Sequence, residues 1–249
     1  LSLDGVRSGR RITQAHELPA FVVAGDCPVA LVREFLGGMF GADGHAPGLQ
    51  RCGEGEEDGT FSAPAFSRSA IQEHVASLRT VMSEVIRLLG RCGVEVEGAR
   101  VYEYPTRRSA TTYAAARDGV PRVEVRLTLP DGLSFVERVG YRYCADKAMR
   151  ASAAAVYWRT LRGIGQQRAW MAERLRSVRA AEPSLSFARA RQQAASALLE
   201  AEPAIFPHYS LLEGSDRFDR LPQSDGGSFR PAHRDAAGFP SPVRLLREM

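Results

Sequence analysis

Two side chains of this chain are suited to ionic or proton-transfer chemistry, Asp43 and Lys147. Asp43 follows a run of apolar residues at helical spacing, so its carboxylate is expected at the C-terminal end of a helix. The helix dipole disfavours negative charge there and favours a nearby cation. Lys147 is the only lysine among 33 basic residues, and an ammonium, unlike a guanidinium, can shift its pKa enough to exchange protons. The alternatives are a plain helix end at Asp43 and a lysine retained by chance.

The helix that would carry Asp43 is expected over residues 28–44, with Asp26 as its N-terminal cap. Apolar residues recur along it at helical spacing, which predicts a buried helix. Gly37, Gly38 and Gly41 lie in its second half, although each glycine costs about 1 kcal/mol relative to alanine. We therefore expect these three glycines to form an interface on which another helix packs.

Two stretches of the sequence resemble a known family. Residues 36–44, LGGMFGADG, resemble the LAGLIDADG motif of homing endonucleases, and the preceding residues 33–35, REF, resemble its intein-borne branch. Residues 140–144, GYRYC, followed by Lys147, resemble a segment that these intein nucleases carry after their last core strand. The chain is therefore similar to an intein-borne LAGLIDADG homing endonuclease domain.

The resemblance implies a site-specific endonuclease that hydrolyses phosphodiester bonds of double-stranded DNA with a divalent metal, Mg²⁺ or Mn²⁺. It implies that Asp43 is catalytic and binds the metal together with the backbone carbonyl of Ala42, because Mg²⁺ prefers oxygen ligands. It also implies that Lys147 assists the attacking water or the phosphate. A maturase or transcription regulator of the same fold, binding nucleic acid without cleavage, is one alternative. A generic α+β domain unrelated to nucleic acids is another.

The hydrophobic pattern predicts an α+β fold. One apolar stripe runs along a helix at residues 71–89, and residues 122–129 alternate strictly as a half-buried antiparallel strand does. Further strands are expected at residues 60–69, with an interruption at Pro64, and at residues 99–106, while residues 20–23 should be extended. The order helix, two strands, helix, two strands, helix matches what the resemblance implies, an αββαββα unit with a four-stranded antiparallel saddle sheet.

The outward side chains of these strands form the predicted DNA-binding surface. An antiparallel sheet can lie in the major groove, with its outward side chains on bases and phosphates. The candidates are Arg68, Arg100, Tyr102, Tyr104, Arg122 and Arg126 on the strands, with Arg107 and Arg108 in a flanking basic loop. Taken singly, each of these arginines is more typical of a solvated surface than of a base contact, so the prediction depends on their forming a row.

Four segments are expected along the chain. Residues 1–27 lead into the core, residues 28–162 form the endonuclease core, residues 163–221 form a helical extension, and residues 222–249 are a tail rich in proline, glycine and serine. The extension should begin where glycines at 163 and 165 interrupt a long helix from Cys144. A further helix should start at Ser184.

A net charge of +4 and a pI near 9.1 are compatible with nucleic-acid binding. The four cysteines form no CxxC pair, which favours a reducing, cytoplasmic compartment. A double-strand cut needs two aspartates of this kind, yet only one motif is present. The expected partner is therefore a second LAGLIDADG motif, from a homodimer mate or from a missing N-terminal half, and the absence of an initial methionine favours a partial chain.

Overall fold

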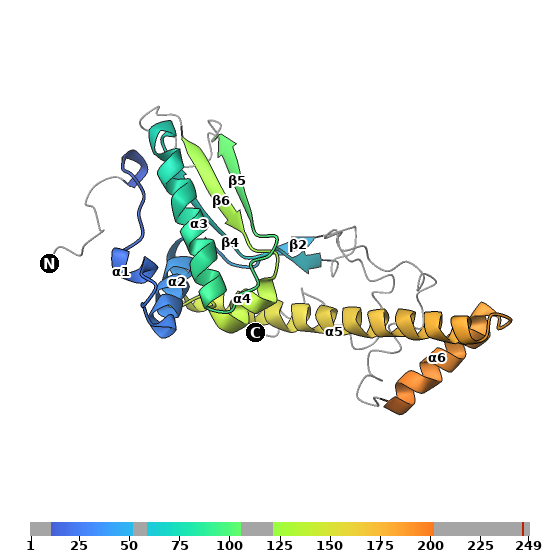
Figure 1. Ribbon diagram of the computed structural model, residues 1–249. Helices are drawn as coiled ribbons and strands as arrows, with labels where there is room; N and C mark the ends of the chain where they lie inside the picture. The colour runs from blue at the N-terminus through green and yellow to red at the C-terminus, as the bar shows by residue number, and fades with distance from the viewer. Residues whose placement is uncertain (1–10, 52–58, 106–121, 202–245, 247–249) are drawn as a thin grey trace. The chain divides into compact units, whose positions relative to one another are not determined.

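A computed structural model describes residues 11–51, 59–105, 122–201 and 246 of the chain (Figure 1). Short 3-10 helices occupy Arg11–Thr13 and Gln72–His74. The helices are α1 (Ala20–Val23), α2 (Val29–Asp43), α3 (Val75–Arg91), α4 (Gly132–Arg138), α5 (Ala145–Ala181) and α6 (Phe187–Ala201). The strands are β1 (Gly44–His45), β2 (Leu49–Arg51), β3 (Gly59–Phe61), β4 (Ala65–Ala70), β5 (Arg100–Pro105) and β6 (Val123–Thr128).

The central sheet has four strands in the order β1-β4-β6-β5, and every neighbouring pair is antiparallel. Strands β2 and β3 form a separate two-stranded hairpin between β1 and β4 in the chain. Without that hairpin the elements from α2 to α4 run helix, two strands, helix, two strands, helix. The fold is α+β with a four-stranded antiparallel sheet, as predicted.

The core lies between the sheet and the two helices α2 and α3, which contact each other and both contact β4 (Figure 1). Phe40 of α2 is fully buried, and its ring centroid lies 5.4 Å from that of Phe66 on β4 and 4.6 Å from that of Phe135 on α4. Val125 and Leu127 of β6 are also fully buried. The residues of β6 and α3 that the sequence pattern predicts to face the core are therefore buried there.

The ends of several helices differ from the predictions. Residues 20–23 form the short helix α1 rather than an extended segment, and Val22 is buried there. Helix α2 has Pro28 at its N-cap with no side-chain cap hydrogen bond, so Asp26 does not cap it. Helix α6 starts at Phe187, where Ser186 Oγ accepts a hydrogen bond from Arg189 N at 3.4 Å, so the cap is Ser186 and not Ser184.

Helix α5 is continuous over 37 residues and passes through Gly163 and Gly165 without a break. A glycine costs only about 1 kcal/mol in a helix interior, and two of them do not outweigh the backbone hydrogen bonds on either side. Between residues 11 and 201, the chain divides into two compact units at the junction of Val156 and Tyr157. In the part of the chain that the structure describes, no helix is both long and apolar enough to cross a membrane.

Candidate functional site

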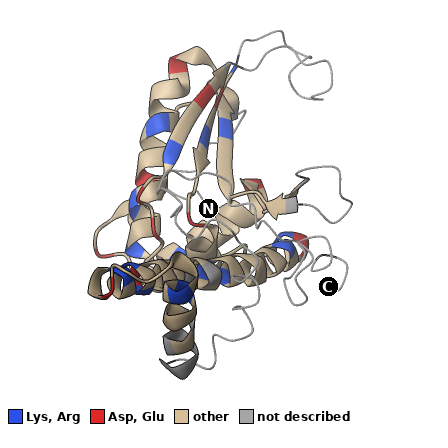
Figure 2. Ribbon diagram, turned by 90° about the vertical axis from the view of Figure 1, so that its right-hand side faces the viewer, with Lys and Arg blue, Asp and Glu red and all other residues tan. Residues whose placement is uncertain are grey.

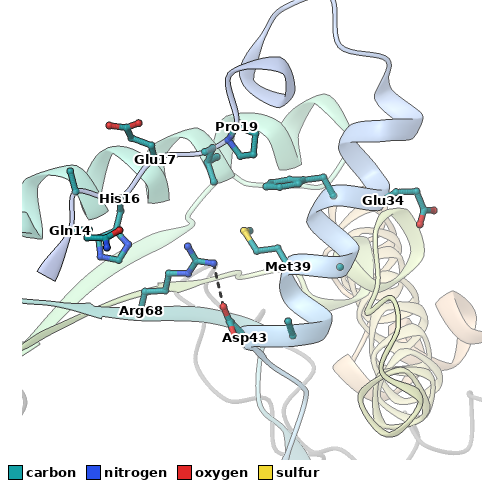
Figure 3. Close-up of a pocket in the computed structure, with 13 residues that line it drawn as sticks. Gln14, His16, Glu17, Pro19, Glu34, Met39, Asp43 and Arg68 are labelled. Atoms are coloured by element: carbon teal, nitrogen blue, oxygen red, sulfur yellow. Dashed lines mark hydrogen bonds and ion pairs between the residues drawn. The ribbon is translucent and has the colours of Figure 1, made fainter. Parts of the chain in front are cut away.

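Asp43 is the last residue of α2, and its side chain is 46% exposed. Arg68 of β4 donates a hydrogen bond from Nη2 to Asp43 Oδ2 at 3.2 Å (Figure 3). The carboxylate thus has the neighbouring cation that its place at the helix end predicts. That cation is an arginine of the same chain.

Lys147, in the first turn of α5, caps the C-terminal end of α2. Its Nζ donates to Ala42 O at 2.9 Å and to Gly44 O at 2.8 Å, and Phe40 O lies 3.5 Å away. The last carbonyls of a helix have no partner within the helix, and an ammonium brings three donors and a positive charge to the negative end of the dipole. The structure therefore brings Lys147, Ala42 and Asp43 together, with the ammonium on the carbonyls.

The residues around Asp43 do not make a metal site by themselves. Ala42 O, predicted as a ligand, accepts a hydrogen bond from Lys147, and the Asp43 carboxylate pairs with Arg68. Among the residues with a described position, no three His, Cys, Asp or Glu side chains are grouped closely enough to hold a metal ion. Divalent ions such as Mg²⁺ need several oxygen ligands. The described residues would supply only part of the coordination shell of such an ion, so a metal at Asp43 stays a prediction.

The glycine face of α2 packs against the loop between α4 and α5. Arg142 N donates to Gly37 O at 2.9 Å. A Cβ atom at Gly37 would overlap the Arg142 side chain, and one at Gly41 would overlap the Arg142 carbonyl, whereas one at Gly38 would lie 3.6 Å from the Tyr143 ring. At Gly37 and Gly41 the close approach is to a loop of the same chain, so packing by a second helix on this face stays a prediction.

The loop owes its shape to two residues with positive φ, Gly140 at 71° and Tyr143 at 60°. Between them, the buried Tyr141 donates from its hydroxyl to His45 O at 2.7 Å. Burial raises the pKa of the Tyr141 hydroxyl far above its ordinary value, so this group remains a donor. The second motif of the sequence, GYRYC, thus holds the end of α2 and the start of the sheet in place.

One face of the sheet is free of helix α2 and helix α3, and we call it the open face. Directly paired residues of neighbouring strands lie on the same face, and Arg126 pairs with both Ser67 and Tyr102. Arg100 pairs with Thr128 and Tyr104 with Glu124, so they share this face. The open face carries Ser67, Arg100, Tyr102, Tyr104, Glu124 and Arg126; Figure 2 shows basic positions along the strands. Arg122 immediately precedes β6 and lies outside the paired residues of the sheet, so its place on this face stays a prediction.

Arg68 does not belong to this row. It pairs with Val125, which is fully buried, and therefore lies on the face that the helices cover. Its guanidinium is beside Asp43 instead of on the predicted DNA-binding surface. Arg107 and Arg108, also predicted to bind DNA, lie outside the described residues.

Sequence reasoning missed His45, the residue directly after the LGGMFGADG stretch. His45 pairs with Ala65 on the open face, and its Nε2 lies 2.9 Å from Ser67 Oγ. Burial lowers the pKa of the His45 imidazole below 6.5, and the charge of Arg126 lowers it further, as does that of Lys147, while Glu124 raises it. The sequence could have indicated this residue, because His45 is only two positions after Asp43 and must lie near it.

We predict that the folded chain loses stability as the pH falls below 6.5. The lowered pKa of His45 means that the folded imidazole binds fewer protons than the unfolded one between its own pKa and 6.5, so acid favours unfolding in that window. NMR titration of the His45 ring measures this pKa directly. Arg126→Met should raise it, whereas Arg87→Met on α3 should not. A pKa that Arg126→Met leaves unchanged would contradict the electrostatic cause.

Comparison with known proteins gives two curated relatives. The chain is 24% identical over 169 residues to the tRNA-splicing ligase RtcB of Methanopyrus kandleri, which covers 68% of this chain and 15% of that protein. It is 25% identical over 154 residues to the tRNA-splicing ligase RtcB of Pyrococcus abyssi, covering 61% of this chain and 14% of that protein. The chain thus spans about 15% of the length of these relatives. No family model and no solved structure matches.

The comparison contradicts the predicted function. Both relatives are named as ligases of tRNA splicing, which is an RNA-processing activity, and neither name describes DNA cleavage or an intein. The prediction of a site-specific DNA homing endonuclease is therefore wrong. The residues of the LGGMFGADG stretch have partners within the chain. Gly37 and Gly41 leave room for Arg142, and Asp43 forms an ion pair with Arg68. Membership of the LAGLIDADG family stays a prediction.

Proposed function

We propose that this chain is the RNA-binding part of a longer RNA-processing enzyme, and that single-stranded RNA binds along the open face of the sheet. The observation that carries the proposal is a pair of exposed aromatic rings on β5. Tyr102 is 38% exposed and Tyr104 is 47% exposed, and their ring centroids are 6.1 Å apart. Exposed aromatic rings on a sheet are platforms on which unpaired bases stack.

The charges around the tyrosines support an anionic ligand. Arg126 is directly opposite Tyr102 on β6, and Arg100 is two residues before Tyr102 on β5. Glu103, between the two tyrosines, points to the other face, where Arg79 Nη2 donates to its Oε2 at 2.8 Å. On strands β4, β5 and β6, only Glu124 opposes the open-face arginines. The surface therefore combines stacking rings with cations for the RNA backbone.

The relatives favour RNA over double-stranded DNA as the ligand, because both are named for tRNA splicing. We also propose that the first unit is a LAGLIDADG-type αββαββα unit, which the order of elements from α2 to α4 supports. A Mg²⁺ or Mn²⁺ ion at Asp43 would need most of its ligands from the RNA or from a second LAGLIDADG motif. We therefore assign no step to a metal.

Loss of the tyrosine rings should weaken RNA binding. The double variant Tyr102→Ala/Tyr104→Ala should bind short single-stranded RNA at least tenfold more weakly, since stacking contributes about 1–3 kcal/mol per base. A plot of the logarithm of the RNA association constant against the logarithm of the salt concentration has a negative slope. Arg126→Ala should make that slope less steep by about 0.7. Fluorescence anisotropy over a salt series measures both effects. Arg87→Ala, on the helix that covers the opposite face, is the control and should bind like the wild type.

Two results would refute this assignment. One is tighter binding to duplex DNA than to single-stranded RNA of the same sequence at equal salt. The other is RNA affinity that does not change when both tyrosines are removed, which would place the RNA on another surface.

A further inference from the structure

A cavity of about 480 Å³ lies between α2 and the segment of residues 14–19 that precedes α1 (Figure 3). This volume is within the range of small-molecule sites. Leu18, Phe35 and Met39 line it with apolar side chains, all three partly buried against the core. The Asp43–Arg68 pair lines it too. The cavity therefore combines apolar walls with the Asp43–Arg68 pair and further polar lining residues, which are Gln14, His16, Glu17 and Glu34.

The polar pair presents a hydrogen-bond acceptor beside a donor. Asp43 is acceptor-only when ionised, and the guanidinium of Arg68 has several N–H groups in a planar fork. Their contact at 3.2 Å involves Oδ2 and Nη2. The edge of a nucleobase also carries donors and acceptors side by side, so it is complementary to such a pair.

The charge of the cavity lining disfavours an anion. Glu17, Glu34 and Asp43 line it together with Arg68. Figure 3 shows Glu34 pointing away from the Asp43–Arg68 pair, and this carboxylate is engaged by Arg142 at 3.5 Å and by the Tyr143 hydroxyl at 3.2 Å. A neutral planar group suits the interior better than a free phosphate does. A phosphate attached to such a group would stay outside.

We propose that this cavity binds one unpaired nucleobase of an RNA strand, which rests on the proposed function. The base would lie against the Phe35 ring and the Met39 thioether, with its hydrogen-bonding edge on Asp43 and Arg68. Single-stranded RNA offers such a base at the lowest cost, because no pairing has to be broken.

The cavity and the open face are connected through adjacent residues. Arg68 follows Ser67 on β4, and the two side chains lie on opposite faces of the sheet. Asp43 is separated from His45 by Gly44 alone, and His45 contacts Ser67 on the open face. The Asp43–Arg68 pair of the cavity therefore lies next in the chain to His45 and Ser67, which are on the open face.

The test measures the binding of nucleosides and of RNA by the same 249-residue chain. Adenosine, guanosine, cytidine and uridine are titrated separately by NMR, and at least one should bind with a dissociation constant of about 1 mM or lower, which is within the ligand-efficiency limit for a molecule of this size. Met39→Trp fills the cavity and should weaken nucleoside and RNA binding at least tenfold. Met149→Trp, at a position 43% exposed on α5, is the matched control and should change neither.

Asp43→Asn tests the recognition without changing the shape of the side chain. An amide offers one acceptor and one donor edge where the carboxylate only accepts, so the order of affinity among the four nucleosides should change. Circular dichroism checks that each variant is folded. An order of affinity identical to that of the wild type would overturn the role of Asp43 in the cavity.

The outcomes separate this inference from the proposed function. If RNA binds through Tyr102 and Tyr104 but no nucleoside binds and Met39→Trp has no effect on RNA, the cavity proposal is wrong and the function stands. If RNA does not bind the chain at all, the proposed function fails. If adenosine monophosphate binds more tightly than adenosine in the cavity, or spermidine displaces the nucleoside, the cavity selects by charge and the nucleobase assignment is overturned.

Discussion

Replacing Lys147 with methionine should destabilise the first unit by about 2–3 kcal/mol, because hydrogen bonds to charged groups are strong and unpaired carbonyls are costly. The ammonium donates to Ala42 O and Gly44 O and lies 3.5 Å from Phe40 O, so one side chain satisfies the end of α2. Methionine has a similar length and no donor. Ala42 O and Gly44 O would lose this donor, and the helix end would lose its positive charge, whereas Phe40 O would keep the Gly44 amide.

Lys147→Arg distinguishes the shape of the cation from its charge. A guanidinium is planar and larger, and its N–H groups diverge in a fixed fork, so it cannot reproduce the contacts of one nitrogen atom with converging carbonyls. We expect this variant to lose about 1 kcal/mol. Its stability would then lie between those of the wild type and the methionine variant.

Urea denaturation followed by circular dichroism measures these changes, and hydrogen exchange of the α2 amides locates them. The control is Arg150→Met, which removes an exposed i,i+4 ion pair with Asp146 on the same helix and should cost no more than about 0.5 kcal/mol. If Lys147→Arg is as stable as the wild type, the chain's single lysine has no special role in this cap.

Regular hydrophobic spacing explains why the main elements could be predicted. The stripe that includes Leu78, Met82 and Val85 is fully buried on α3, and the inward residues Val125 and Leu127 of β6 are fully buried against it. Both patterns extend over enough residues to identify the element and the face it buries. Helices α2 and α3 and strands β5 and β6 were therefore found within a few residues of their ends.

Short elements were predicted less well, since few residues define their pattern. In β4 the sequence Phe66-Ser67-Arg68-Ser69-Ala70 alternates, and its parity places Arg68 with the buried residues Phe66 and Ala70. The charge of Arg68 suggested the opposite face. Its ion pair with Asp43 explains how the arginine is accommodated there, and that partner is 25 residues away in the chain.

The function was harder to predict than the fold, because one motif permits several uses of the same residues. Small residues in a helix indicate close packing but do not identify what packs against them. At Gly37 and Gly41 the neighbour is Arg142, more than 100 residues later in the sequence. Likewise, an aspartate at a helix end indicates a cation but does not distinguish a metal from Arg68.

Gly41→Ala should lower the stability of the fold, whereas Gly38→Ala should not. A Cβ atom at Gly41 would overlap the backbone carbonyl of Arg142, so the loop would have to move and overpacking of this kind costs about 1–3 kcal/mol. The shift would also strain the hydrogen bonds from Arg142 N to Gly37 O and from the Tyr141 hydroxyl to His45 O. We expect Gly41→Ala to be less stable by about 2 kcal/mol.

Gly38 is the matched control, because it lies on the same helix and near the same loop. Its added Cβ would be 3.6 Å from the Tyr143 ring, an ordinary contact, and alanine is favoured over glycine in a helix by about 1 kcal/mol. Gly38→Ala should therefore be as stable as the wild type or slightly more stable. Urea denaturation gives both values, and hydrogen exchange of the Arg142 amide should accelerate only in Gly41→Ala. Equal shifts in the two variants would show that helix propensity alone decides the outcome and that the loop does not require glycine at position 41.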